Sequence, residues 1–259
     1  MAVITLLTDF GTREPWVGIM KGVILGGCPG ATLVDLTHEV PPQDVRTGAL
    51  LLADAYDYFP AGTIHVAVVD PGVGSARPAV AVATDGGFLV GPDNGLFSAV
   101  LETHPPRAVV RLTRARFHLP QVSPTFHGRD VFAPVAAALG RGVPLSDLGD
   151  PHGELVRRPL PRAVFTGDAL RGEVLHVDAF GNLLTSVREE DLPRVGEPVV
   201  VCVGAHQIRG ISRTFSDVAV AQSVAYAGSS GWLEVAVRDG NAARVLGAER
   251  GTAVVVRRG

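Results

Sequence analysis

The sequence predicts an α/β N-terminal domain with a doubly wound, mainly parallel sheet, followed by a smaller, mainly antiparallel β-barrel-like C-terminal domain. In the first half of the chain, short β-branched runs alternate with longer helical patterns, which is typical of parallel strands joined by helices. The run at 66–69 is apolar at every position, as expected for a strand that helices cover on both faces. From residue 172 onward, short strand-like runs separated by turn residues predict antiparallel β structure.

The elements of the N-terminal domain are predicted from hydrophobic periodicity. Strands are predicted at 3–7, 32–36, 64–69, 88–90 and 108–112, and helices at 17–25, 45–59, 96–101 and 131–139. In the C-terminal domain, strands are predicted at 174–177, 183–187, 199–203, 232–237 and 253–256. No internal repeat or heptad pattern interrupts this order.

The domain boundaries follow from a change in composition. Proline, glycine and arginine crowd the stretch at 151–165, which favours a linker over regular structure. We therefore expect an N-terminal domain at 1–150, a linker at 151–165 and a C-terminal domain at 166–259.

Composition excludes several classes of partner. The 23 basic residues nearly balance the 26 acidic ones, and the net charge of -3 gives no electrostatic footprint for nucleic acid or an anionic membrane. No apolar run approaches the roughly 20 residues that span a bilayer. The N-terminus reaches an acidic residue after a few apolar ones and lacks the basic start of a signal peptide. Cys28 and Cys202 lie in apolar settings far apart in sequence, so we expect reduced thiols and a cytoplasmic protein.

Three predicted strands end in polar loops, and these loops carry the first candidate residues. Asp9 follows the first strand, His38 lies after the second, and Asp70 follows the third in a loop rich in glycine. The carboxyl ends of parallel strands meet at one sheet edge, where ligands bind at the reversal of strand order. We therefore expect Asp9 and Asp70 to face one pocket. The alternative for any single aspartate of this kind is an Asx turn or a helix cap.

Arg77 and His127 extend this candidate site. Arg77 lies just beyond the glycine-rich loop, where a tight turn would let it pair with Asp70 and hold the carboxylate ionised. A surface ion pair of little energetic value is the alternative. His127 precedes the last predicted helix of the domain, near the same sheet edge, although a single histidine is more often structural than catalytic. The other seven histidines have no comparable setting.

Other chemistries fit poorly. The sequence has neither an HExxH nor a CxxC pattern, so it predicts no metal site. Gly228-Ser229-Ser230-Gly231 lacks the spacing of a serine nucleophile elbow. The loop after Asp70 lacks both the dinucleotide fingerprint and the lysine of a phosphate-binding loop.

Six segments taken together identify a family. They are Leu7-Thr8-Asp9-Phe10-Gly11, Asp35-Leu36-Thr37-His38, Val69-Asp70-Pro71-Gly72-Val73-Gly74, Gly91-Pro92-Asp93-Asn94-Gly95-Leu96, Thr125-Phe126-His127-Gly128-Arg129-Asp130 and Asp178-Ala179-Phe180-Gly181-Asn182. In this order the sequence resembles the S-adenosyl-L-methionine (SAM) hydroxide adenosyltransferases, relatives of fluorinase and chlorinase. The resemblance covers essentially the whole chain.

The resemblance implies hydrolysis of SAM to adenosine and L-methionine by attack of water or hydroxide at ribose C5′. Asp70, Arg77 and His127 match the family's Asp-Arg-His trio position for position. A hydrogen-bonded acid-base cluster can align a water molecule and relieve it of a proton, and which of the three accepts that proton stays open. SAM is the substrate, so no cofactor is implied, and the activated sulfonium carbon needs no metal.

The same resemblance implies the substrate contacts. Asp9 is expected to bind the ribose hydroxyls, and Asn182 to read the adenine edge. Asp178 and Ser229 are expected at the ammonium and carboxylate ends of the methionine half, and Phe215 to stack on adenine, with Phe180 also in the binding pocket. Turn residues and a core phenylalanine are the structural alternatives.

Departures from the halogenases favour water as the nucleophile. The halogenases carry an extra loop soon after the position of Arg77 and lack the histidine of the trio, whereas this chain runs compactly from Arg77 to Phe88 and has His127. The alternatives are a halogenase-like 5′ transferase and a non-catalytic sensor of SAM or adenosine. The resemblance further implies a homotrimer, with each site formed between the N-terminal domain of one subunit and the C-terminal domain of the next.

Overall fold

The computed structural model describes residues 2–259, which form two compact units, one ending at Pro159 and the other beginning at Leu160. The elements of the first unit are β1 (Val3–Thr8), α1 (Trp16–Gly27), β2 (Thr32–Thr37), α2 (Val45–Tyr56), β3 (Thr63–Val68), β4 (Ala79–Ala83), β5 (Gly87–Pro92), α3 (Val100–Thr103), β6 (Ala108–Arg111), α4 (Ala133–Gly140) and β7 (Asp150–Pro151). Those of the second are β8 (Val164–Thr166), β9 (Ala169–Val177), β10 (Leu183–Arg188), β11 (Val199–Val203), β12 (His206–Arg209), β13 (Ser223–Ala227), β14 (Trp232–Val237), α5 (Ala242–Leu246) and β15 (Ala253–Arg258).

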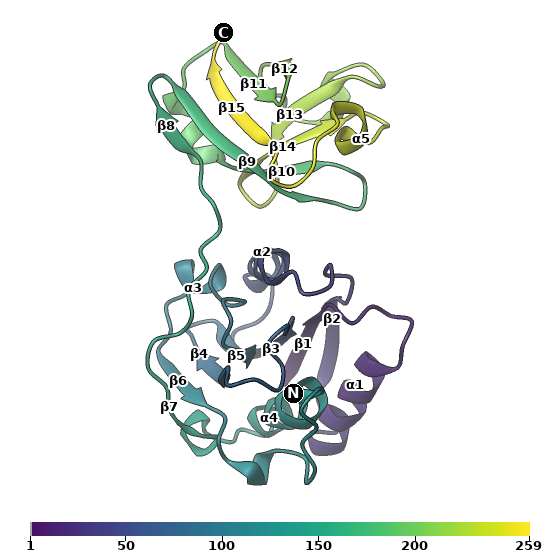
Figure 1. The fold of residues 1–259 in the computed structure, drawn as a ribbon, viewed down its shortest axis with the longest axis vertical. Helices are drawn as coiled ribbons and strands as arrows, with labels where there is room; N and C mark the ends of the chain where they lie inside the picture. The colour runs from purple at the N-terminus through teal and green to yellow at the C-terminus, as the bar shows by residue number, and fades with distance from the viewer. Residues whose placement is uncertain (1) are drawn as a thin grey trace. The chain divides into compact units, whose positions relative to one another are not determined.

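The first unit is built on a seven-stranded mixed sheet with a parallel core (Figure 1). Its strand order is β2-β1-β3-β5-β4-β6-β7, in which β2, β1, β3 and β5 are parallel and the remaining strands are antiparallel. The chain passes outward from β1 to β2 and then returns across β1 to β3. The strand order therefore reverses between β1 and β3, and their carboxyl ends define the crevice where such sheets bind ligands.

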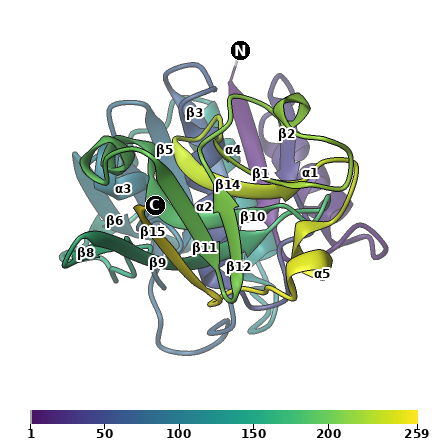
Figure 2. The same cartoon turned by 90° about the horizontal axis from the view of Figure 1, so that it is seen from above.

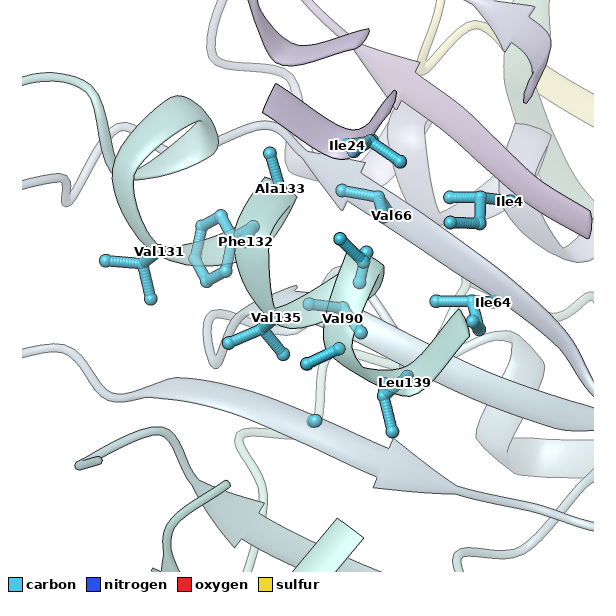
Figure 3. Close-up of a cluster of buried hydrophobic side chains, with 14 of the residues drawn as sticks. Ile4, Ile24, Ile64, Val66, Val90, Val131, Phe132, Ala133, Val135 and Leu139 are labelled. Carbon is cyan, nitrogen blue, oxygen red and sulfur yellow. The ribbon is translucent and has the colours of Figure 1, made fainter. Parts of the chain in front are cut away.

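Helices cover both faces of this sheet, which confirms the predicted doubly wound arrangement. On one face, Ile4 of β1 and Val66 of β3 pack with Ile24 of α1 and with α4, as Figure 3 shows. On the other face, Leu7 of β1 packs with Leu52 of α2. Side chains alternate between the two faces along β1, because successive residues of a strand point in opposite directions. The two layers hold the ends of β1 and β3 in register.

The first unit differs from the sequence prediction in five elements, one of which is the short strand β7, which was not predicted. The strand β4 was not predicted; it consists of alternating alanine and valine, and lies antiparallel beside β5. The helix expected at 96–101 is mostly turns, because the backbone N–H of Leu96 bonds to the Asn94 side chain and that of Ser98 to the Gly95 carbonyl. Only α3 is helical there. The helix α2 ends at Tyr56 instead of residue 59, and α4 is preceded by a π-helical turn at Gly128–Phe132.

The second unit is an antiparallel, nearly closed β-barrel, as the sequence predicts. The strand order is β12-β11-β15-β9-β10-β14-β13, with β8 paired to β9, and several of these strands lie side by side in Figure 2. The end strands β12 and β13 also contact each other, so little of the sheet edge stays open. The inward-facing aliphatic residues form one core. Strands β8, β12 and β13 and helix α5 were not predicted; β12, for example, has the mostly polar sequence His-Gln-Ile-Arg.

Between residues 2 and 259, no helix combines the length and the apolar character that crossing a membrane requires.

Candidate active site

Arg77 joins Asp70 and His127 into one hydrogen-bonded cluster. The Arg77 Nε–H donates to Asp70 Oδ1 at 2.9 Å, and Arg77 Nη2 contacts both Asp70 Oδ2 and His127 Nδ1, the latter at 2.8 Å. The Asp70 and Arg77 side chains are only 5% and 9% exposed. The pair is therefore no loose surface ion pair, and its fork-to-fork geometry fixes both groups. The guanidinium also lies 5.5 Å from the centre of the Phe132 ring.

The loop after β3 turns sharply enough to bring Arg77 back over Asp70. Backbone bonds from Val73 to Asp70 and from Ser75 to Gly72 close two successive turns. Gly74 has φ +77°, and a Cβ there would lie 2.4 Å from the carbonyl oxygen of Pro124. Only glycine fits this position. The loop is thus packed directly against the segment that carries His127.

His127 lies at the start of the π-helical turn, close to Arg129 and Asp130, which carry opposite charges. Asp130 is fully buried, and its carboxylate accepts hydrogen bonds from the Arg129 side chain at 2.6 Å and from the Ser123 backbone at 2.8 Å. Burial and the neighbouring Arg77 charge lower the pKa of His127 below its usual value, and Asp70 and Asp130 only partly oppose this. His127 is therefore neutral near pH 7.

Asp9 and Asp70 line the same pocket, as expected for residues that follow adjacent strand ends. In the ladder between β1 and β3, Thr8 pairs with Val68, which places the two loops side by side. The pocket has a volume of about 370 Å³ and is lined by Asp9, Phe10, Pro42, Gln43, Val68, Asp70, Pro71, Val73, Thr125, Phe126, His127 and Gly128. One Asp9 oxygen accepts a hydrogen bond from the Gln43 backbone at 2.8 Å, so the carboxylate is held in place and keeps acceptor capacity.

His118 is a neighbour of this cluster that sequence reasoning missed. Its Nε2 atom is buried without a hydrogen-bond partner among residues 2–259. Burial lowers the pKa of His118, and repulsion from the protonated form of His127 lowers it further. The backbone bond from Leu119 to Asp130 holds this segment against the π-helical turn. Nothing in the local sequence signals the proximity, because it depends on how the segment at 115–119 folds back.

A second pocket lies in the second unit and collects all the candidate residues of that domain. Its volume is about 920 Å³, and Asp178, Phe180, Asn182, Phe215 and Ser229 all line it. Phe180 is 78% exposed and Phe215 is 41% exposed, so both leave apolar surface uncovered at this pocket.

Asp178 and Asn182 form the two ends of a tight turn. Asp178 accepts hydrogen bonds from the backbone N–H groups of Phe180 and Asn182 and from the Asn182 side-chain amide, at 2.8–2.9 Å. The amide of Asn182 is thereby oriented: one N–H points to Asp178, and the second N–H and the oxygen remain for another partner. That pattern suits the edge of a nucleobase.

Several further residues of the second pocket, which include the cation Arg238, were not singled out from the sequence. Tyr226, Arg213 and Glu234 also line it, and Tyr226 packs against Phe215 with ring centres 4.8 Å apart. Tyr226 and Glu234 belong to the paired strands β13 and β14. Since β13 was not predicted, this cross-strand pairing could not be inferred.

Comparison with known proteins matches both units to one family. Residues 4–149 match the SAM hydroxide adenosyltransferase N-terminal domain, and residues 172–255 match the C-terminal domain of the same family. The chain is 44% identical to an (R)-S-adenosyl-L-methionine hydrolase of Thermus thermophilus, over 98% of this chain and 99% of that protein. It is 31% identical to a fluorinase of an Actinoplanes species, over 75% of this chain and 74% of that protein.

A solved structure has the same fold. An uncharacterised conserved protein from Thermotoga maritima superposes with a TM-score of 0.93 at 34% identity, and the match covers 98% of this chain and all of that one. The α/β unit with its Asp-Arg-His cluster, together with the barrel and its large pocket, defines a two-domain protein of the fluorinase-related class. The chain belongs to the SAM hydroxide adenosyltransferase family.

The electrostatic effect of Arg77 on His127 can be tested by measuring the pKa of the histidine. In a titration of the histidine ring signals by NMR, we expect His127 to titrate below 6.5 in the wild-type protein, because burial and Arg77 disfavour the imidazolium. In Arg77→Met the pKa should rise, since the positive charge is gone and Asp70 and Asp130 remain. Arg77→Lys, which keeps the charge, is the matched control. A His127 pKa that is unchanged in Arg77→Met would contradict the proposed electrostatic coupling.

Proposed function

We propose that this chain hydrolyses SAM to adenosine and L-methionine, with water attacking ribose C5′. The relatives that support this over nearly the full length are named (R)-S-adenosyl-L-methionine hydrolases. The observation that carries the proposal is the hydrogen-bonded cluster of Asp70, Arg77 and His127, of which Asp70 and His127 line one pocket with Asp9. We also take the (R) epimer at sulfur as the substrate, because the relatives are named for it.

The reaction requires alignment more than strong activation. The oxygen of water forms a bond to C5′, the C5′–S bond breaks, and its electron pair stays on sulfur as a neutral thioether. Sulfonium is already a good leaving group, so the protein must hold the water in line and remove one proton. Fixed polar groups around the water do this without reorganising during the reaction.

The hydrogen bonds of Arg77 support one arrangement of the protons in the cluster. A guanidinium can only donate, so the Nδ1 atom of neutral His127 is the acceptor and its hydrogen lies on Nε2. In that tautomer His127 donates from Nε2 and orients the water oxygen. Each Asp70 oxygen accepts one bond from Arg77 and keeps a second lone pair. We therefore propose that Asp70 accepts the proton.

The substrate contacts are proposed from the two pockets. Asp9 binds the ribose hydroxyls with the oxygen that Gln43 leaves free. Asn182, oriented by Asp178, reads the adenine edge, and Phe215 and Phe180 pack on the base. Asp178 and Ser229 face the methionine half.

We further propose a homotrimer, in which each site combines the first unit of one subunit with the second unit of its neighbour. The candidate water-activating residues lie in the first unit and the candidate adenine-binding residues in the second, and one SAM molecule must contact both sets. An interface between subunits satisfies this need and closes by rotational symmetry.

Turnover and the site of attack can be tested together. Purified protein is incubated with each sulfonium epimer of SAM in H₂¹⁸O, and the products are followed by chromatography and mass spectrometry. We expect adenosine carrying ¹⁸O at O5′ and unlabelled methionine, formed faster from the (R) epimer. Parallel reactions contain chloride or fluoride. A 5′-halo-adenosine would establish a halogenase-like transferase, and intact bound SAM would establish a sensor.

Substitutions should separate chemistry from binding. Asp70→Asn and His127→Ala should lower kcat by about 10²–10⁴, the usual range for loss of acid-base catalysis, with SAM affinity nearly unchanged. Asp9→Asn and Asn182→Ala should mainly weaken binding, by about tenfold for each lost hydrogen bond. Single-turnover rates and calorimetric affinities give both quantities. Equal losses of rate and affinity in Asp70→Asn would contradict its proposed role, and unchanged affinity in Asn182→Ala would contradict the adenine contact.

Mixed subunits test the shared site. In a trimer assembled from equal amounts of Asp70→Asn and Asn182→Ala subunits, about a quarter of the sites should combine two intact units by random assortment. At limiting SAM, the activity of the mixture should therefore rise to about a quarter of the wild-type activity. A mixture of Asp70→Asn and His127→Ala is the control, because both changes lie in the same unit and no intact site can form. Absence of recovery in the first mixture would place each site within one subunit.

A further inference from the structure

Glu234 is a carboxylate in an otherwise apolar strand. Strand β14 has the sequence Trp-Leu-Glu-Val-Ala-Val. Leu233, Val235 and Val237 face the barrel core, so Glu234 projects from the opposite face with Trp232 and Ala236. On that face it is half-buried and lines the large pocket of the second unit.

Tyr226 holds this carboxylate in position. The two residues are directly opposite in the antiparallel ladder between β13 and β14, and the Tyr226 hydroxyl donates to Glu234 Oε2 at 2.6 Å. Burial raises the pKa of Tyr226, and the hydrogen bond and charge of Glu234 raise it further, with a smaller contribution from Asp178. The phenol therefore stays protonated and acts as the donor, and the Glu234 carboxylate is its acceptor.

Gly228 leaves room for the other carboxylate oxygen. A Cβ at position 228 would lie 2.0 Å from Glu234 Oε1, so any larger residue would displace the carboxylate. Within the part of the chain that the structure describes, no lysine, arginine or histidine forms an ion pair with Glu234. The neighbouring Ser229 lines the same pocket. Arg213 and Arg238 line the same pocket but form no ion pair with Glu234, so this half-buried carboxylate has one neutral donor and can take a cationic ligand group.

The carboxylate of Asp178 has less free hydrogen-bond acceptor capacity than that of Glu234. Its two oxygens already accept hydrogen bonds from Phe180 and from the backbone and side chain of Asn182. These bonds maintain the turn and orient Asn182, and they use most of the acceptor capacity of the carboxylate. Among residues 2–259, Glu234 accepts a hydrogen bond only from the hydroxyl of Tyr226, so it has more acceptor capacity left for an ammonium group.

We infer that Glu234 is a specificity-determining residue that receives the α-ammonium group of the methionine half of SAM, next to Ser229. This inference rests on the proposed function for the identity of the ligand. An ammonium group offers three N–H donors, which suits a carboxylate that has one oxygen beside a glycine and the other fixed by a phenol.

The inference is tested by comparing SAM with its deamino analogue, in which the α-amino group is replaced by hydrogen. Binding is measured by calorimetry in His127→Ala protein, with and without Glu234→Gln, and adenosine serves as a second ligand. We expect Glu234→Gln to weaken SAM binding by about tenfold, as for loss of one charge-assisted hydrogen bond, while affinities for the deamino analogue and adenosine change less than twofold. Tyr226→Phe, which keeps the carboxylate, should preserve the preference for SAM.

The possible failures are distinguishable. Equal weakening of SAM and the deamino analogue would overturn the inference and assign Glu234 to the sulfonium or to the structure of the pocket. Unchanged SAM affinity would also overturn it. Unchanged adenosine binding in Glu234→Gln shows that the variant folds. A wild-type protein that binds SAM without hydrolysing it would contradict the proposed function alone, because the comparison of ligands depends only on binding.

Discussion

The geometry of the first unit depends on a single buried guanidinium. Arg77 is almost fully covered, and a buried charge of this kind is strongly destabilising unless opposite charge and hydrogen bonds compensate it. Asp70 supplies the charge, and His127 and the Pro78 carbonyl take further N–H groups. The contacts of Arg77 therefore fix the relative positions of the end of β3, the glycine-rich loop and the start of the π-helical turn. Removing any one partner would leave a buried polar group unsatisfied.

The same interaction fixes the protonation of the cluster. Arg77 cannot accept a hydrogen bond, so His127 must present an unprotonated Nδ1 atom to it, and burial favours the same neutral state. Asp130 lies behind the histidine, but its charge is already satisfied by Arg129 and the Ser123 backbone. In the mechanism proposed above, the cluster combines the Asp70–Arg77 ion pair with one neutral ring and offers a donor and an acceptor to a water molecule. Because these polar groups are already in place, they can stabilise the charge that develops during the reaction without having to reorient.

Sequence reasoning could place the first pocket because its residues follow from topology. Once β1 and β3 are recognised as neighbours at a reversal of strand order, Asp9 and Asp70 must lie close together, and glycines at 72 and 74 let the chain turn Arg77 back toward Asp70. The β4 strand escaped prediction because five small alanine and valine residues carry little periodicity.

The residues missed in both units depend on contacts that the sequence does not encode locally. His118 approaches His127 through a fold-back that is held by one backbone bond, from Leu119 to Asp130. Glu234 and Tyr226 meet only through the register of β13 with β14. A strand prediction gives the face of each residue but not its cross-strand partner, which requires the register.

The carboxylates of the two pockets have different partners, and this difference affects how SAM would be bound. In the first pocket Asp70 is paired with Arg77, whereas the partner of Glu234 among the described residues is the neutral hydroxyl of Tyr226. An anion placed beside the sulfonium would stabilise the substrate most and lose that interaction as the positive charge leaves sulfur, which raises the barrier. An ammonium group keeps its charge from substrate to product. A carboxylate directed to the ammonium therefore contributes equally to binding in the ground state and the transition state, and it adds affinity without slowing the attack at C5′.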